Sequence, residues 1–95
     1  YRLVVRNYRG DGGEVDIIAW DGPVLCFVEV RARADASFGD PLETIDRAKI
    51  ARIGRAARDF LEQLPRPWPA MRFDAVGVLL GPPIELHIVQ DAFEL

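Results

Sequence analysis

The hydrophobic positions of this chain follow two spacings, which predict five strands and one helix. Segments that are apolar at every second position, or apolar throughout, are typical of strands. Such segments occupy residues 2–6, 14–20, 24–31, 71–80 and 84–90. We expect the strongly apolar segment 71–80 inside the sheet and the alternating segment 84–90 at its edge. The glycine-rich residues 7–13 and the residues 32–40 are expected to be loops.

The apolar spacing changes to that of a helix over residues 41–64. Asp40 is suited to cap this helix and Pro41 to begin it, and a proline-rich segment ends it. Its apolar face would hold Leu42, Ile45, Ile53, Ala57, Phe60 and Leu64. Lys49 falls on the same face and should lean toward the sheet. Alternatively, it pairs with Asp46 and leaves only its stem against the core.

Charged residues occupy every second position in part of the second and third strands. Glu14 and Asp16 share one face of their strand, because side chains two positions apart point the same way. By the same rule, Glu29 and Arg31 share one face of the next strand. Acids on the inner face of a sheet are costly unless they are paired or bind a cation. These two strands therefore hold the candidate site.

The turn between these strands decides which acids meet. A four-residue loop places Asp16 opposite Glu29 and Glu14 opposite Arg31, where a salt bridge could form. A two-residue loop would place Glu14 opposite Glu29 instead. In either register two carboxylates share one face, and they repel unless a cation or a proton lies between them.

Composition narrows the class of protein. The 95 residues are 49% hydrophobic and 28% charged, which is typical of a globular protein, and we treat residues 1–95 as one domain. No apolar run approaches the roughly 18 residues of a membrane span. Cys26 is the only cysteine, so a disulfide framework is excluded and a cytoplasmic location is expected. The net charge of −3 argues mildly against a nucleic-acid partner, although basic residues cluster in the helix.

Several motifs, in this order, give a resemblance to a known family. They are Arg6-Asn7-Tyr8-Arg9, Gly13-Glu14-Val15-Asp16-Ile17-Ile18-Ala19, Phe27-Val28-Glu29-Val30-Arg31-Ala32-Arg33 and Arg72-Phe73-Asp74. Together they resemble the uncharacterised YraN-like family of bacterial proteins. That family is assigned to the restriction-endonuclease-like, or PD-(D/E)XK, nuclease superfamily and is similar to archaeal Holliday-junction resolvases. The resemblance implies an α/β fold, with a mixed β-sheet, the long helix on one face, and an N-terminal helix that is apparently missing here.

The resemblance also implies roles for individual residues. Asp16 and Glu29 would bind Mg²⁺ or Mn²⁺, with the backbone carbonyl of Val30 as a further ligand. These are the hard oxygen ligands that Mg²⁺ prefers. Arg31 stands in place of the superfamily's lysine; it cannot act as a base, but it can hold a phosphate with two hydrogen bonds. Lys49 would then assist catalysis near the attacking water.

The expected function is hydrolysis of DNA phosphodiester bonds by a divalent-metal-dependent endonuclease. Branched or damaged DNA, as in repair or recombination, is the expected substrate. The DNA backbone would be held with little sequence preference by Arg33, Arg47, Arg52 and Arg55. The loop 32–40 could close over the substrate, because it leaves its strand just past Arg31.

Several alternatives stay open. The chain could be a non-catalytic module that retains the nuclease fold and binds nucleic acid or a protein. It could also form a homodimer through an exposed edge or a bare sheet face. Glu14 could be an additional metal ligand rather than a partner of Arg31. Asp74 could belong either to the site or to the structural framework.

Overall fold

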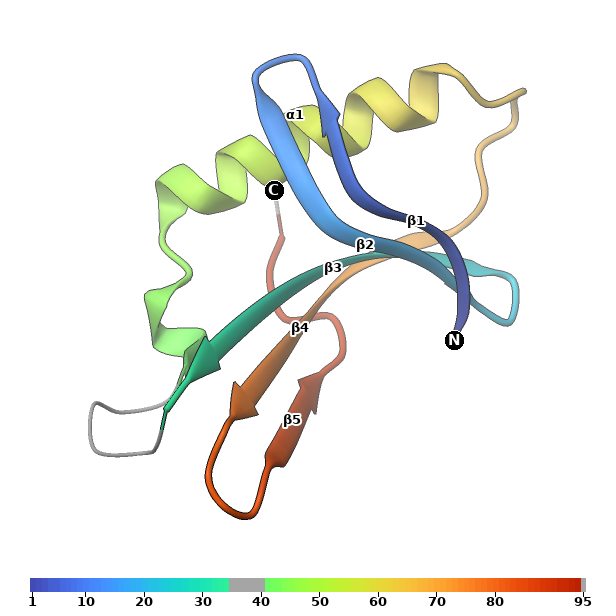
Figure 1. The fold of residues 1–95 in the computed structure, drawn as a ribbon. Coiled ribbons are helices and arrows are strands. Elements are labelled where there is room, and N and C mark those ends of the chain that lie inside the picture. Colours follow the sequence, from blue (N-terminus) through green and yellow to red (C-terminus); the bar gives the residue numbers. More distant parts are fainter. Residues whose placement is uncertain (35–40, 95) are drawn as a thin grey trace.

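The computed structural model describes residues 1–34 and 41–94. Within these residues, one long helix lies on one face of a five-stranded mixed sheet (Figure 1). The strands are β1 (Arg2–Gly10), β2 (Gly13–Asp21), β3 (Val24–Arg33), β4 (Met71–Leu79) and β5 (Glu85–Val89). A short 3-10 helix, η2 (Pro41–Thr44), precedes the helix α1 (Arg47–Glu62). This is the predicted α/β fold, and it is consistent with a restriction-endonuclease-like arrangement.

The strands pair in the order β1-β2-β3-β4-β5. β1, β2 and β3 form an antiparallel meander, β4 runs parallel to β3, and β5 returns antiparallel to β4. The crossover from β3 to β4 contains α1, as a parallel connection requires. The segment 71–80 therefore lies inside the sheet and the segment 84–90 at its edge, which confirms both predictions.

Several element boundaries differ from the sequence-based predictions, two of them by four residues or more. β1 continues to Gly10, through much of the segment expected to be a loop, and the turn is made by Asp11 and Gly12, whose φ angles are 51° and 76°. α1 begins at Arg47 rather than at residue 41, because the carboxylate of Asp46 caps it.

Some of the predictions lie outside the described residues. The expected cap Asp40 and most of the loop 32–40 lie outside the described residues, so closure of that loop over a substrate stays a prediction. The first residues of this loop belong to β3, which continues to Arg33.

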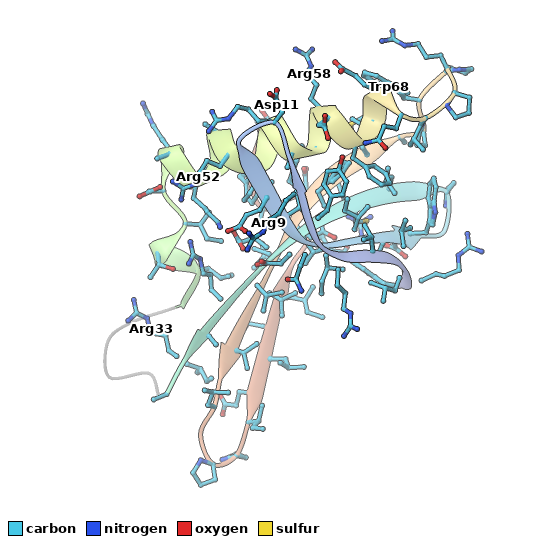
Figure 2. The ribbon with its side chains drawn as sticks, turned by 45° about the horizontal axis from the view of Figure 1, so that its top comes forward. Arg9, Asp11, Arg33, Arg52, Arg58 and Trp68 are labelled. Carbon is cyan, nitrogen blue, oxygen red and sulfur yellow. The ribbon has the colours of Figure 1, made fainter. Side chains whose placement is uncertain are left out.

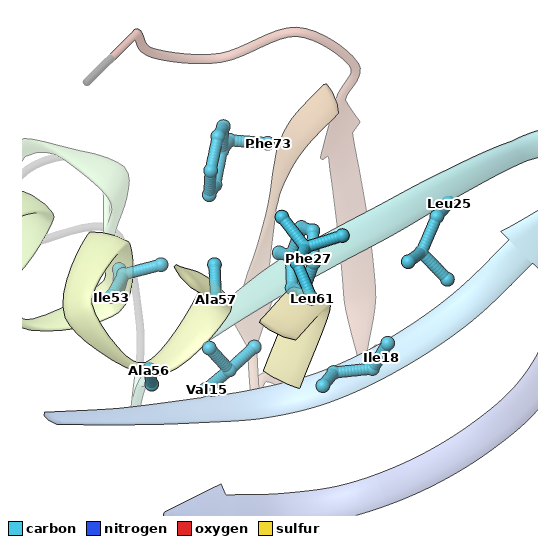
Figure 3. Packing of buried hydrophobic residues seen from close by; sticks show 9 residues of the cluster. All are labelled: Val15, Ile18, Leu25, Phe27, Ile53, Ala56, Ala57, Leu61 and Phe73. Carbon is cyan, nitrogen blue, oxygen red and sulfur yellow. The ribbon is translucent and has the colours of Figure 1, made fainter. Parts of the chain in front are cut away.

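The hydrophobic core lies between α1 and the sheet (Figure 3). Its fully buried members are Val15, Ile18, Leu25, Phe27, Ile53, Ala56, Ala57, Leu61 and Phe73. Phe60 and Leu64 pack against this cluster, so the predicted apolar face of the helix is largely correct. Leu42 and Ile45 precede α1, because the helix starts later than predicted. The core thus fixes α1 against β2 and β3, the two strands with the alternating charges.

The other face of the sheet carries no helix in the described part of the chain (Figure 1). On the edge strand β5, Leu86 and Ile88 are more than half exposed, at 63% and 60%. No helix of the described residues is long and apolar enough to cross a membrane.

Candidate active site

The β2–β3 hairpin opens where its alternating charges begin. The ladder between these strands ends at the pair Ile17–Val28. Beyond this pair, the backbone N–H of Val30 donates a hydrogen bond to Oδ2 of Asp16 at 2.8 Å. A side chain of β2 therefore enters the gap between the separating strands. Four side chains meet in this gap, and we call them the carboxylate fork. They are Glu14, Asp16, Glu29 and Lys49.

The observed register is one of the two that the sequence left open. Trp20 pairs with Leu25, which is the register predicted from a four-residue loop. The turn itself is shorter, because Asp21 and Val24 also pair and Gly22 adopts a φ of 57°. The alternative register, with Glu14 opposite an acid of β3, is wrong.

Glu29 is the buried acid of the carboxylate fork. It is 3% exposed, and Oε2 of its carboxylate accepts no hydrogen bond from the described residues. The same Oε2 forms an ion pair with Nζ of Lys49 at 3.2 Å. Burial, followed by the neighbouring Asp16 carboxylate, raises the pKa of Glu29 to about 7 against the opposing effect of Lys49. Burial and the neighbouring Asp16 carboxylate therefore disfavour the charged form of Glu29.

Lys49 brings a positive charge from α1 into the carboxylate fork. Its side chain is 10% exposed, and Nζ lies 3.5 Å from Oε1 of Glu14 as well as next to Glu29. The lysine leans toward the sheet, as its position on the apolar face of the helix predicts. The alternative pairing with Asp46 is not observed, because Oδ1 of Asp46 instead accepts the backbone N–H of Lys49 at 2.8 Å.

Glu14 lies at the solvent side of the carboxylate fork. In addition to Lys49, it contacts Nε of Arg9 at 3.6 Å. Its predicted salt bridge with Arg31 is absent among the described residues. The physical reason is that positions 14 and 31 lie beyond the last ladder pair, where β2 and β3 have already separated.

Arg31 and Arg33 follow Glu29 at every second position of β3, so all three side chains share one face. Both arginines are half-buried, and Nε of each is buried without a hydrogen-bond acceptor in the described part of the chain. A buried donor without an acceptor is costly. Two such donors beyond the carboxylates are suited to an anionic ligand.

The three helix arginines predicted to bind DNA do not form one group. Arg52 borders the same cleft as Glu14, and Nη2 of Arg55 donates to the carbonyl of Gly12 at 3.5 Å. Arg47 lines a different groove with Trp68, and Arg55 borders this groove as well. Arg9 is the Cα partner of Glu14 in the β1–β2 ladder. It was not among the predicted site residues, because residues 7–13 were expected to be a loop.

The donor set of the carboxylate fork fits a divalent cation. No group of three or more acidic, histidine or cysteine side chains in the described residues is arranged to hold a metal. Mg²⁺ does not require one, since it keeps several waters and needs only one or two carboxylates. Asp16 and Glu29 supply two hard ligands, and Oε2 of Glu29 lies 3.2 Å from Nζ of Lys49, which a bound cation would have as its neighbour.

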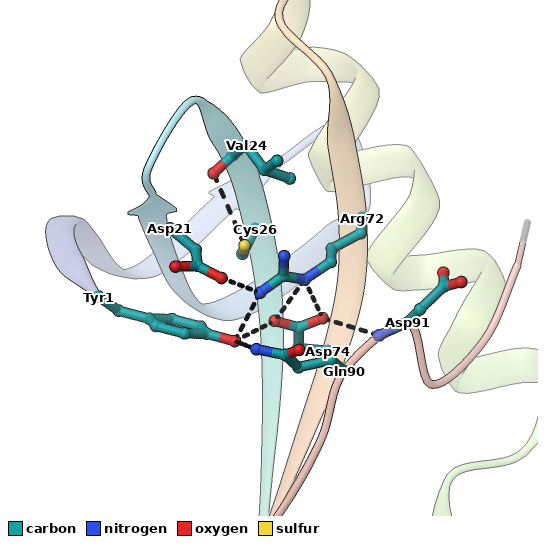
Figure 4. Close-up of polar contacts among 8 residues, drawn as sticks. All are labelled: Tyr1, Asp21, Val24, Cys26, Arg72, Asp74, Gln90 and Asp91. Carbon is teal, nitrogen blue, oxygen red and sulfur yellow. Dashed lines mark hydrogen bonds and ion pairs between the residues drawn. The ribbon is translucent and has the colours of Figure 1, made fainter.

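Asp74 belongs to a different cluster, on the other face of the sheet. Its oxygens accept hydrogen bonds from Nε of Arg72 at 2.9 Å and from the hydroxyl of Tyr1 at 2.7 Å (Figure 4). Arg72 also binds Asp21 at 2.7 Å. We call this group the Arg72 network, and we assign Asp74 to the structural framework rather than to the carboxylate fork. Arg72 belongs to one of the motifs that carry the family resemblance, but its partners were not predicted from the sequence.

Comparison with other proteins places the chain in a family. A UPF0102 protein of Chlorobaculum tepidum is 49% identical over 79 residues, which are 83% of this chain and 61% of the relative. A UPF0102 protein of Chlorobaculum parvum is 47% identical over 81 residues, covering 85% and 63%. One from Symbiobacterium thermophilum is 42% identical over 95 residues, covering 98% and 80%. The chain thus spans less than two thirds of the length of the first two relatives.

The family's own sequence model gives the same result. The model of the uncharacterised protein family UPF0102 matches residues 1–78, a range that includes the carboxylate fork and β4 up to Val78. The chain belongs to the uncharacterised protein family UPF0102.

Proposed function

We propose that this chain is the core of a divalent-metal-dependent endonuclease that hydrolyses DNA phosphodiester bonds. The observation that supports this most strongly is Glu29, a buried carboxylate beside Asp16 with an oxygen that accepts no hydrogen bond from the described residues, although it lies 3.2 Å from Nζ of Lys49. Such a pair is costly unless a cation completes it. Perturbed acids of this kind are typical of catalytic sites.

In this proposal Asp16 and Glu29 hold Mg²⁺ or Mn²⁺, with the Val30 carbonyl and Glu14 as further candidate ligands. When bound, the metal supplies a water of lowered pKa and a positive charge for the phosphoryl oxygens. The N–H of Val30 holds the Asp16 carboxylate in place, and α1 delivers Lys49 to the same point.

The cationic side chains of the site hold the substrate. Arg31 keeps its proton, so its role is to bind a phosphate and stabilise the charge that builds on it. Lys49 donates hydrogen bonds at the reacting centre. Arg33, Arg52 and Arg55 contact the DNA backbone, which gives little sequence preference.

The resemblance to junction resolvases suggests branched or damaged DNA as the substrate, and repair or recombination as the process. A cytoplasmic location, in which Cys26 stays reduced, is part of the same proposal. Because the chain spans only part of several relatives, the proposal concerns the whole protein in which these residues occur.

A second function is favoured by one specific contact. The ammonium of Lys49 lies 3.2 Å from Glu29 and supplies a cation within the chain itself. Arg31, in addition, cannot serve as a base. Both features suit a non-catalytic module that retains the nuclease fold and binds nucleic acid or a protein.

Cleavage assays with Mn²⁺ and Mg²⁺ separate the two functions. The protein is incubated with supercoiled, linear and branched DNA, alongside Asp16→Asn, Glu29→Gln and the control Glu62→Gln. We expect either fork variant to lower the cleavage rate by about 10³-fold or more, since a metal contributes several kcal/mol to such a reaction. Glu62 is exposed on α1, and its variant should cut normally.

Absence of cleavage and of Mn²⁺ binding by the wild-type protein would overturn the catalytic proposal in favour of the binding module. Lys49→Ala tests the lysine separately. Normal cleavage by this variant would remove Lys49 from the mechanism while leaving the metal site intact.

A further inference from the structure

A second cleft adjoins the carboxylate fork. It lies between the tip of the β1–β2 hairpin and α1, encloses about 530 Å³, and is lined by Arg9, Glu14, Arg52 and residues 10–13. Figure 2 shows Arg9 and Arg52 at this position. We call it the hairpin cleft. Because Glu14 belongs to both, the hairpin cleft is continuous with the candidate active site.

The walls of the hairpin cleft are held in place by contacts with α1. A Cβ atom at Gly13 would lie 1.9 Å from the backbone carbonyl oxygen of Arg52, so only glycine permits this approach. Tyr8 hydrogen-bonds to Asp59 and accepts a hydrogen bond from Nε2 of Gln63 at 2.7 Å. The cleft is therefore preformed and does not depend on a flexible loop.

Two arginines supply the positive charge of the hairpin cleft. The side chain of Arg9 is 81% exposed and, within the described residues, has one ion pair, with Glu14. Arg52 is exposed and has no hydrogen bond or ion pair with the described residues. A guanidinium of this kind can form two hydrogen bonds to a phosphate.

Two acids also line the cleft. Glu14 is shared between Arg9 at 3.6 Å and Lys49 at 3.5 Å, so its charge is largely neutralised. Asp11 lies at the turn, has no ion pair within the described residues, and opposes an anion. Among the residues that the structure describes, no aromatic side chain lines the cleft, so these residues offer charge for a phosphate but no surface on which a base could stack.

We propose that the hairpin cleft binds the phosphate next to the scissile one on the same DNA strand, and that it reads the backbone without reading the base. The inference rests on the proposed function and adds to it the course of the strand. The two sites are joined by a chain of ion pairs. Glu29 contacts Lys49 at 3.2 Å, Lys49 contacts Glu14 at 3.5 Å, and Glu14 contacts Arg9 at 3.6 Å, so the two sites are neighbours. The strand passes from Arg33 and Arg31 over the carboxylate fork to Arg9 and Arg52.

The test removes the charge from one phosphate at a time. The full protein with Mn²⁺ cleaves an oligonucleotide at a mapped position, and neutral methylphosphonates are placed at successive positions around it. We expect a methylphosphonate at one position beside the cut to lower the cleavage rate of the wild type by about tenfold, which is the effect of losing one hydrogen bond to a charged group. Arg52→Ala should lower the rate of cleavage of the unmodified substrate by the same factor. Combining the variant with the methylphosphonate should lower the rate no further. An abasic nucleotide at that position should be cleaved at the normal rate.

The control is Arg58→Ala, which removes an exposed arginine of the same helix that does not line the hairpin cleft, and it should leave all rates unchanged. Asp11→Asn should strengthen DNA binding, because it removes the unpaired acid of the cleft. Independent, multiplicative losses from Arg52→Ala and the methylphosphonate would overturn the inference while leaving the proposed function standing. A protein that cleaves no DNA with any metal overturns both.

Discussion

Glu29 and Asp74 are buried carboxylates on neighbouring strands, and they differ in almost every other respect. In the β3–β4 ladder Glu29 is the partner of Ala75, and Asp74 the partner of Val28, so the two acids point to opposite faces of the sheet. Glu29 is 3% exposed and Asp74 is 0% exposed. Burial is therefore nearly equal, and any difference in behaviour comes from their partners.

Asp74 has as many partners as a carboxylate needs. Arg72, Tyr1 and the backbone N–H of Asp91 all donate to it, the last at 2.9 Å. Burial alone would raise the pKa of Asp74, but these hydrogen bonds outweigh it and the pKa is lowered. Glu29, in contrast, faces another carboxylate, and its pKa is raised. A satisfied acid stabilises the fold, whereas an unsatisfied acid marks a place where a ligand is expected.

The largest expected effect comes from making the same chemical change at both acids. Asp74→Asn should lower the free energy of unfolding by about 3–5 kcal/mol, because it leaves Arg72 without a full partner. Glu29→Gln should cause no loss at pH 8 without metal, and even a gain, because it removes an uncompensated charge. Urea denaturation of both variants measures the difference.

Equal destabilisation by the two variants would contradict the comparison. Glu29 would then be one half of a structural ion pair with Lys49, and the non-catalytic function would be favoured. Glu62→Gln serves again as the control, since this exposed carboxylate should change stability by only a few tenths of a kcal/mol.

A smaller effect is expected in the pH dependence of stability, with opposite signs at the two acids. The folded-state pKa of Glu29, about 7, exceeds its unfolded value near 4.5, so its contribution to stability is complete below about pH 4.5 and is lost as the pH rises through 7. At most about 3 kcal/mol is involved. The lowered pKa of Asp74 gives the reverse, with stability lost only as the pH falls below about 4.

Denaturation in a chelator from pH 3 to pH 8 measures both effects. Between pH 5 and pH 8, the free energy of unfolding of the wild type should fall relative to that of Glu29→Gln. A difference that stays constant over that range would mean that Glu29 is ionised throughout and already compensated by Lys49. In the Asp74→Asn variant, the free energy of unfolding should no longer fall steeply below pH 4.

The two regions also differ in how far the sequence predicts them. The alternation of Glu14, Asp16, Glu29 and Arg31 was visible because strand geometry places every second residue on one face. The position of Lys49 followed from helical spacing in the same way. Both rules act over a few residues, so they identify the strands of the carboxylate fork and the face of α1 that meets them.

The contacts that sequence spacing does not encode were missed or mistaken. The Arg72 network joins residues as far apart as Tyr1 and Asp74, and only the assembled sheet brings them together. The Glu14–Arg31 pairing failed because strand separation beyond Ile17–Val28 is a property of the twisted sheet, not of either strand. Arg9 was missed because β1 extends three residues or more past its predicted end, and so carries it to Glu14.

The smallest expected effect, and the sharpest distinction between the two acids, is stabilisation by metal. A cation that binds only the folded protein adds about 1.4 kcal/mol to the free energy of unfolding at a free concentration about ten times its Kd. Mn²⁺ should therefore raise the Tm of the wild type and leave Asp16→Asn unchanged. The shift should be larger at pH 8 than at pH 6, because at pH 6 the metal must first displace the proton that Glu29 holds. A shift that survives in Asp16→Asn would locate the cation elsewhere, and the charge of the carboxylate fork would then be balanced by Lys49 and, at Glu14, by Arg9.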